Sequence, residues 1–111
     1  MADNYDFVIN CTDGVCDETQ YDYGINLTEL VKAEAEGTLK ETAEVLHVAA
    51  MADVKEYAKF VMALNHLLWD RYNKGDEKTA RIYDALWRKY DGFAYKHFKG
   101  KDLDWYIRYL D

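Results

Sequence analysis

At 111 residues the chain has the length of a single domain, and no apolar run approaches the roughly 20 residues that cross a bilayer. Half of its residues are hydrophobic and 32% are charged, which excludes an ordinary disordered chain and favours a globular body. The net charge of −7 argues against direct binding to nucleic acid and favours a basic partner.

Residues 1–25 differ in pattern from the rest of the chain, and we expect a short β-hairpin or an irregular acidic arm. Side chains at every second position follow the period of a strand, and these are Tyr5, Phe7, Ile9 and Cys11. Asp13-Gly14 then supplies a two-residue hairpin turn that would place Cys11 opposite Cys16. The returning residues 17–20 show no apolar alternation, so both forms stay open.

Residues 26–111 are expected to form the helical body of the same single domain. Asn26, Thr38 and Asp53 are each followed three residues later by a glutamate, a pattern that caps the first turn of a helix. Further helix ends and starts are marked by Gly37, Gly75, Asp76, Gly100 and Asp102. The expected helices are 27–36, 39–51, 54–73, 77–98 and 102–110. The predicted fold class is therefore mainly α, a compact bundle of about four to five helices.

The third and fourth expected helices carry the clearest apolar stripes, with side chains recurring at steps of three and four. In the third helix the stripe is Val54, Tyr57, Val61, Leu64, Leu68 and Tyr72. In the fourth helix it is Ala80, Tyr83, Trp87, Tyr90 and Ala94. Asp91-Gly92 interrupts the fourth helix, and we expect a kink or a split there. The short connection 73–76 predicts that these two helices pack as an antiparallel pair.

No pattern of cysteine, histidine or carboxylate amounts to a catalytic or metal site. Cys11 and Cys16 match neither a C-x-x-C redox motif nor a zinc ligand set, so we expect two thiols, with a cross-strand disulfide as the alternative. Glu44 and His47 form a single E-x-x-H step, whereas a di-metal bundle needs two such steps and two more glutamates. The sequence has no nucleophile elbow, phosphate-binding loop or H-E-x-x-H. We therefore expect no enzyme activity, no metal and no cofactor.

The charge is concentrated near the beginning of the chain, and tyrosines accompany it. Residues 1–36 carry nine acids and one base, whereas residues 37–111 carry 12 acids and 13 bases. Carboxylates can stand in for phosphates in an Arg- and Lys-rich groove, and tyrosine rings can receive guanidinium groups. The expected partner-binding residues are Asp6, Asp13, Asp17, Glu18, Tyr21, Asp22 and Tyr23. In the alternative, the tyrosines pack onto the helices and the acids keep the protein soluble. The tryptophans Trp69, Trp87 and Trp105 are expected as core or near-core anchors.

In size, acidity and lack of catalytic motifs, the chain resembles the small anti-defence proteins of phages and mobile elements, such as antirestriction and anti-CRISPR proteins. That resemblance rests on no sequence motif, so it assigns a role to no single residue. It implies a non-catalytic inhibitor that occupies the nucleic-acid-binding site of a basic protein partner. The opening residues, Met-Ala-Asp-Asn-Tyr-Asp, lack the basic and apolar regions of a secretory signal, and we expect a cytoplasmic protein.

Two other functions stay open. A helical structural or assembly protein would form homo-oligomers by packing its acidic segment on a neighbouring copy. A small nucleic-acid-binding regulator would use the basic segment 88–101, in which basic side chains alternate with aromatic rings. These residues are Arg88, Lys89, Tyr90, Phe93, Tyr95, Lys96, His97, Phe98, Lys99 and Lys101. The same bases also suit the end of a helix, where they complement its dipole.

Overall fold

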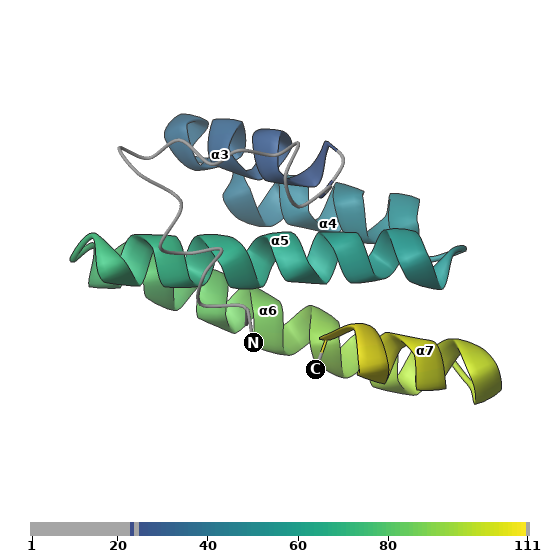
Figure 1. The fold of residues 1–111 in the computed structure, drawn as a ribbon. Helices are drawn as coiled ribbons and strands as arrows, with labels where there is room; N and C mark the ends of the chain where they lie inside the picture. Colours follow the sequence, from purple (N-terminus) through teal and green to yellow (C-terminus); the bar gives the residue numbers. More distant parts are fainter. Residues whose placement is uncertain (1–22, 24, 111) are drawn as a thin grey trace.

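Five helices make up the part of the chain that the computed structural model describes, which is Tyr23 and residues 25–110 (Figure 1). They are α3 (Asn26–Glu36), α4 (Leu39–Ala50), α5 (Val54–Asn73), α6 (Glu77–His97) and α7 (Gly100–Leu110). Each helix agrees with an expected one to within two residues at either end. The predicted all-α bundle is therefore confirmed for these residues, whereas the expected hairpin or arm lies almost wholly outside them.

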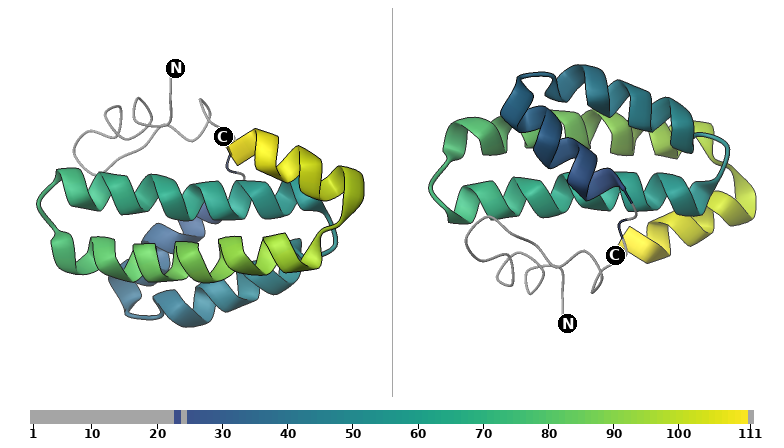
Figure 2. Two further views of the ribbon diagram at one scale, coloured as in Figure 1. Left: turned by 90° about the horizontal axis from the view of Figure 1, so that it is seen from below. Right: turned by 90° about the horizontal axis from the view of Figure 1, so that it is seen from above.

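The two longest helices, α5 and α6, form the centre of the bundle and run side by side in every view (Figures 1 and 2). They are joined by three residues that include Gly75, whose φ of 83° is in the left-handed region that glycine tolerates best. Helices α3 and α4 lie together over one side of this pair, and α7 lies against α5 (Figure 2). Helix α5 consequently contacts all four other helices. No helix in the described part of the chain is both long and apolar enough to cross a membrane.

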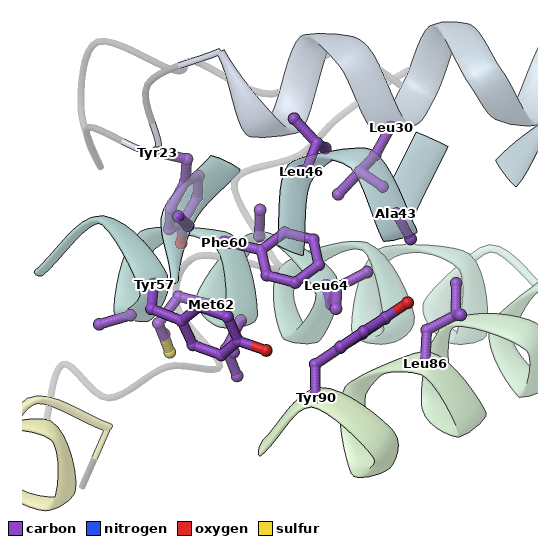
Figure 3. Close-up of a cluster of buried hydrophobic side chains, with 14 of the residues drawn as sticks. Tyr23, Leu30, Ala43, Leu46, Tyr57, Phe60, Met62, Leu64, Leu86 and Tyr90 are labelled. Carbon is purple, nitrogen blue, oxygen red and sulfur yellow. The ribbon is translucent and has the colours of Figure 1, made fainter. Parts of the chain in front are cut away.

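Helix α5 is buried on more than the single stripe that its sequence predicts. Four stripe residues are buried as expected: Val54, Tyr57, Val61 and Leu64. Further buried side chains on its other faces include Ala58, Phe60, Met62, Ala63 and Leu67. A helix covered by neighbours on several sides must be apolar on several sides. Figure 3 shows the resulting core, in which residues of α5 meet Leu30 and Leu46 from above and Tyr90 from below.

The expectation that Tyr72 belongs to the buried stripe is wrong, because this side chain is 54% exposed. Tyr72 lies in the last turn of α5, beside the connection to α6, where it lines a surface hollow with Leu68 and Trp69. Trp69 is half-buried, and Trp87 and Trp105 are partly buried against the core. The expected near-core position of Trp87 and Trp105 is therefore confirmed.

Two of the predicted caps form hydrogen bonds at helix starts, and three do not. The Asp53 carboxylate accepts from the amide of Lys55 at 2.9 Å, and the Asp76 carboxylate accepts from that of Thr79 at 3.2 Å. Asn26 and Thr38 make no such bond, and Asn26 lies one residue inside α3. Asp102 lies inside α7, because that helix already begins at Gly100, and it complements the helix dipole there.

Helix α6 runs unbroken across Asp91-Gly92, so the expected split is wrong. Gly92 is not among the described glycines that have positive φ. The Asp91 carboxylate accepts a hydrogen bond of 2.8 Å from the hydroxyl of Tyr106 in α7, which gives the acid a tertiary role in place of a turn.

Replacing Gly92 should test whether this glycine is needed for the fold. A β-carbon there would meet nothing within 4 Å, so Gly92→Ala should raise the free energy of unfolding by about 0.5–1 kcal/mol, as expected inside a helix. Gly37 ends α3 at a φ of 78°, and Gly37→Ala should lower the same free energy by about 1 kcal/mol. Urea unfolding followed by circular dichroism measures both. A destabilising Gly92→Ala would contradict the helical geometry described here.

Candidate functional site

Of the seven expected partner-binding residues, the structure describes only Tyr23, and it places this ring in the core. Tyr23 is 1% exposed and points from the chain before α3 toward α5 (Figure 3). Its ring centroid lies 5.3 Å from that of His66, and its hydroxyl lies 3.5 Å from Nδ1 of the same histidine. Tyr23 is thus a core residue rather than part of the described surface. The other six residues lie outside the described part of the chain: Asp6, Asp13, Asp17, Glu18, Tyr21 and Asp22.

The described body carries no net charge. It contains 14 lysines and arginines and 14 aspartates and glutamates. The whole net charge of −7 therefore resides in residues 1–22 and in Asp111, which together hold seven acids and no lysine or arginine. The acidic residues of the chain are consequently of two kinds: those on a balanced helical body, and those in a segment whose own sequence contains no lysine or arginine.

The segment joins the body at a fixed point. The ring of Tyr23 is buried, and its carbonyl oxygen accepts a hydrogen bond of 2.8 Å from the Asn26 side chain. Its partner His66 is 1% exposed, and burial lowers the pKa of this imidazole from 6.5 to about 4, with the Asp70 carboxylate offsetting part of the effect. His66 is therefore neutral at physiological pH, as a tyrosine-packed core position requires.

A network of buried charges holds α3, α5 and α6 together. The Arg71 guanidinium contacts both the Asp70 and the Glu34 carboxylates, and its Nη2 lies 3.0 Å from Glu34 Oε1. Lys74 Nζ lies 3.0 Å from the Asp70 carboxylate, which is 1% exposed. The hydroxyl of Tyr83 donates to Glu34 at 2.7 Å. The bond with Glu34 helps to raise the pKa of Arg71, although burial alone would lower it. These groups stabilise the fold, and each charge in the network is paired with another described side chain.

The E-x-x-H step on α4 takes part in a second polar and aromatic cluster. His47 is buried, and its Nδ1 lies 2.7 Å from the hydroxyl of Tyr57. Burial lowers the pKa of His47, partly offset by Glu44. The Glu44 carboxylate accepts from the hydroxyl of Tyr90 at 3.1 Å, and the ring of Phe93 meets His47 edge-on at 4.5 Å. Within Tyr23 and 25–110, no three histidine, cysteine or acidic side chains gather as a metal ion would need.

An open hollow of about 650 Å³ lies beside this cluster, between α4 and α6. Three cationic side chains of α6 line it, namely Arg88, Lys89 and Lys96, together with Phe93 and Gly92. Glu44 and His47 form the α4 side. This hollow combines cations, a half-exposed aromatic ring and a carboxylate at one place on the described surface.

The basic segment 88–101 is divided by the fold. Its rings do not form one exposed surface, because Tyr90 and Phe98 are buried in the core while Tyr95 is 46% exposed. Lys99 precedes α7 and Lys101 lies in its first turn, and neither lines the hollow. The expected basic and aromatic surface is thus reduced to the residues around the hollow.

The sequence alone did not predict the contacts that form the charge network around Arg71 or those that hold Tyr23 in the core. Glu34 and Tyr83 are 49 residues apart, and Tyr23 and His66 are 43 apart, so no local pattern links them. The chain matches no protein-family model, no curated protein and no solved structure.

The buried His66 should make stability depend on pH. In the unfolded chain this histidine takes up a proton near pH 6.5, whereas in the folded protein it does so only near pH 4. Its contribution is therefore complete above pH 6.5 and lost as the pH falls toward 4, by about 3 kcal/mol in total. Urea unfolding at several pH values gives the free energy of unfolding as a function of pH. Between pH 4 and 6.5 this free energy should change less steeply with pH in His66→Gln than in the wild type. The pKa of His47 is also lowered, so His47 accounts for part of the pH dependence that remains in the variant.

An equal slope of this free energy against pH in His66→Gln and the wild type would show that His66 does not stay neutral in the folded protein.

The buried ion pairs should matter far more than the surface pairs. Arg71→Met leaves Glu34 and the buried Asp70 without this partner, and the free energy of unfolding should fall by about 3 kcal/mol. The matched control is Arg81→Met, which removes an exposed pair with Glu77 and should cost under about 1 kcal/mol. Similar losses in the two variants, measured by urea unfolding, would contradict the assignment of the network as structural.

Proposed function

We propose that this chain is a non-catalytic protein–protein interaction module in which the acidic residues 1–22 bind a basic partner. Most concretely, it acts as an inhibitor that occupies the nucleic-acid-binding site of that partner, in the manner of antirestriction and anti-CRISPR proteins. The proposed contact residues are Asp6, Asp13, Asp17, Glu18, Tyr21 and Asp22. Tyr23 is the anchor that joins them to the body and not itself a contact.

The observation that carries this proposal is the division of charge. The described body balances 14 acids with 14 bases, whereas residues 1–22 contain six acids and no lysine or arginine. Acids that serve solubility alone can be spread over a surface among bases. A segment that concentrates them without counterions produces a strong local field, which attracts a basic surface and speeds association with it.

The anchor supports the proposal in a second way. Binding through an untethered segment costs conformational entropy, and a fixed attachment point reduces that cost. The buried Tyr23 ring and the hydrogen bond from Asn26 provide such a point at the beginning of α3. The helical body then excludes nucleic acid from the occupied site by its bulk.

A second candidate, a homo-oligomeric assembly protein, is favoured by one surface feature. Val45 and Val48 of α4 are 66% and 58% exposed, and Ile25 before α3 is 69% exposed. The two valines are three residues apart on one face of the helix, and neighbouring exposed aliphatic side chains are typical of interfaces. Light scattering over a range of concentrations separates the two functions, since assembly predicts a mass that rises with concentration and inhibition of a partner does not require it.

Neutralising three acids of the segment tests the main proposal. The chain is used to capture a basic partner from a host lysate, and association with that purified partner is followed by surface plasmon resonance. The triple variant Asp17→Asn, Glu18→Gln, Asp22→Asn should associate about tenfold more slowly at low salt and show a flatter salt dependence. Nucleic acid should compete with the wild-type chain for the partner.

The matched control removes three exposed acids of the body that form no ion pair in the described structure, by Glu36→Gln, Glu41→Gln and Asp102→Asn. It removes the same three negative charges as the first variant and should leave the rate of association with the partner nearly unchanged. An equal effect of the two triple variants would assign the attraction to net charge alone. Unchanged binding in the first variant would exclude residues 17–22 from the contact.

A further inference from the structure

The hollow between α4 and α6 has the size and chemistry of a small-ligand site. Its volume of about 650 Å³ falls within the range that pockets for small molecules occupy. Its walls come from two helices that the core fixes relative to one another, since His47 of α4 and Tyr90 of α6 are both buried and their rings lie 4.8 Å apart. The site is therefore formed before any ligand arrives.

Cations lie at both ends of the hollow along α6. Lys89 and Lys96 are exposed, and neither forms an ion pair with a described residue. Seven residues of helix separate them by about 10 Å, so a ligand lying along the hollow can reach either ammonium group. Arg88 adds a third cation, whose exposed pair with Asp84 at 3.0 Å is weak enough to be exchanged. Such a set of donors suits phosphate oxygens.

An aromatic surface lies between the two lysines. Phe93 is half-buried, and its ring stacks on that of His97 at 5.0 Å and 20°. The ring also meets His47 edge-on at 4.5 Å and lies 5.7 Å from the ring of Tyr57. These neighbours fix its orientation, and the part of the ring that lines the hollow offers a rigid apolar contact to a base.

The α4 side supplies a hydrogen-bond acceptor. One Glu44 oxygen accepts from the Tyr90 hydroxyl at 3.1 Å, and the exposed carboxylate retains further acceptor capacity. Ribose hydroxyls and the amino groups of bases are donors that such a carboxylate recognises. The inner side of the hollow contains the neutral His47, so no buried positive charge competes for Glu44 there.

Gly92 is the residue whose presence the fold does not explain. It lies inside α6, where glycine weakens a helix, and a β-carbon at this position would meet nothing within 4 Å. No close packing therefore requires a glycine. Gly92 lines the hollow together with Phe93, and its missing side chain leaves open the space that a Cβ would occupy there.

From these four features we infer that the hollow binds a nucleotide, with phosphate oxygens at Lys89 and Lys96 and the base against Phe93. The nucleotide can be free or part of a single strand, because both offer the same phosphate and base. The inference is independent of the function proposed for residues 1–22, since none of those residues contributes to the hollow as described.

Titration of the full-length chain with ADP, adenosine and inorganic pyrophosphate tests this inference. Two-dimensional NMR and calorimetry at low salt should show saturable binding of ADP that shifts the amide signals around Gly92. Adenosine and pyrophosphate should each bind more weakly than ADP, because each offers only one half of the recognised chemistry. A short single-stranded oligonucleotide is titrated in parallel, and tighter binding than that of ADP would identify a strand as the source of the nucleotide.

Two variants divide the site into its parts. Lys89→Gln with Lys96→Gln should weaken ADP binding about tenfold and leave adenosine binding nearly unchanged. Gly92→Leu fills the space beside Phe93 and should weaken both ligands, while thermal unfolding confirms that the variant is folded. The control pair Lys99→Gln with Lys101→Gln removes the same charge outside the hollow and should have no effect.

Two results would overturn the inference. One is the absence of saturable ADP binding at millimolar concentrations. The other is an equal loss in both lysine pairs, which would reduce the interaction to general charge attraction. Neither result bears on the partner-binding test, because the carboxylates of residues 17–22 remain in place throughout.

Discussion

The described structure depends on the enclosure of α5 by four other helices. A helix buried on several sides removes more apolar area from water than an amphipathic surface helix of the same length, and this burial is the main stabilising term available to so short a chain. Because α5 is enclosed, polar groups on it are also buried. His66 and Asp70 lie one turn apart and are each 1% exposed, so both need polar partners. Tyr23 and the Arg71 and Lys74 side chains provide them.

Those polar contacts determine how the ends of the bundle are joined. Glu34 brings the end of α3 to Arg71 of α5 and to Tyr83 of α6, and a buried ion pair of this kind is specific because the loss of either partner is costly. Tyr23 holds the chain before α3 against the same central helix. Tyr23, the described residue that directly follows the acidic segment in the sequence, is therefore fixed by the core.

Local sequence pattern was sufficient to predict the helices but not to predict which residues come together at the candidate sites. Helix periodicity and capping residues near Asp53 and Asp76 depend on neighbours a few residues away, and these predictions agree with the structure. Whether Tyr72 or Tyr23 is buried depends instead on where other helices end and on which side chains lie across the bundle. For this reason the sequence predicted burial for Tyr72, which is exposed, and left the burial of Tyr23 as an alternative. The hollow was equally hidden, because Glu44 and His47 approach residues more than forty positions further along the chain.

The net charge of −7 looks like an argument against any anion site, and it would be one if the charge were evenly spread. In this chain the described body is neutral, so the field near a given group is set by its neighbours rather than by the total. At physiological ionic strength, charges beyond about 8 Å are largely screened. Around the hollow the described neighbours are three cations and Glu44, with Asp84 partly neutralising Arg88. A chain with a negative net charge can therefore still carry a place on its body at which cations and a half-exposed ring coincide.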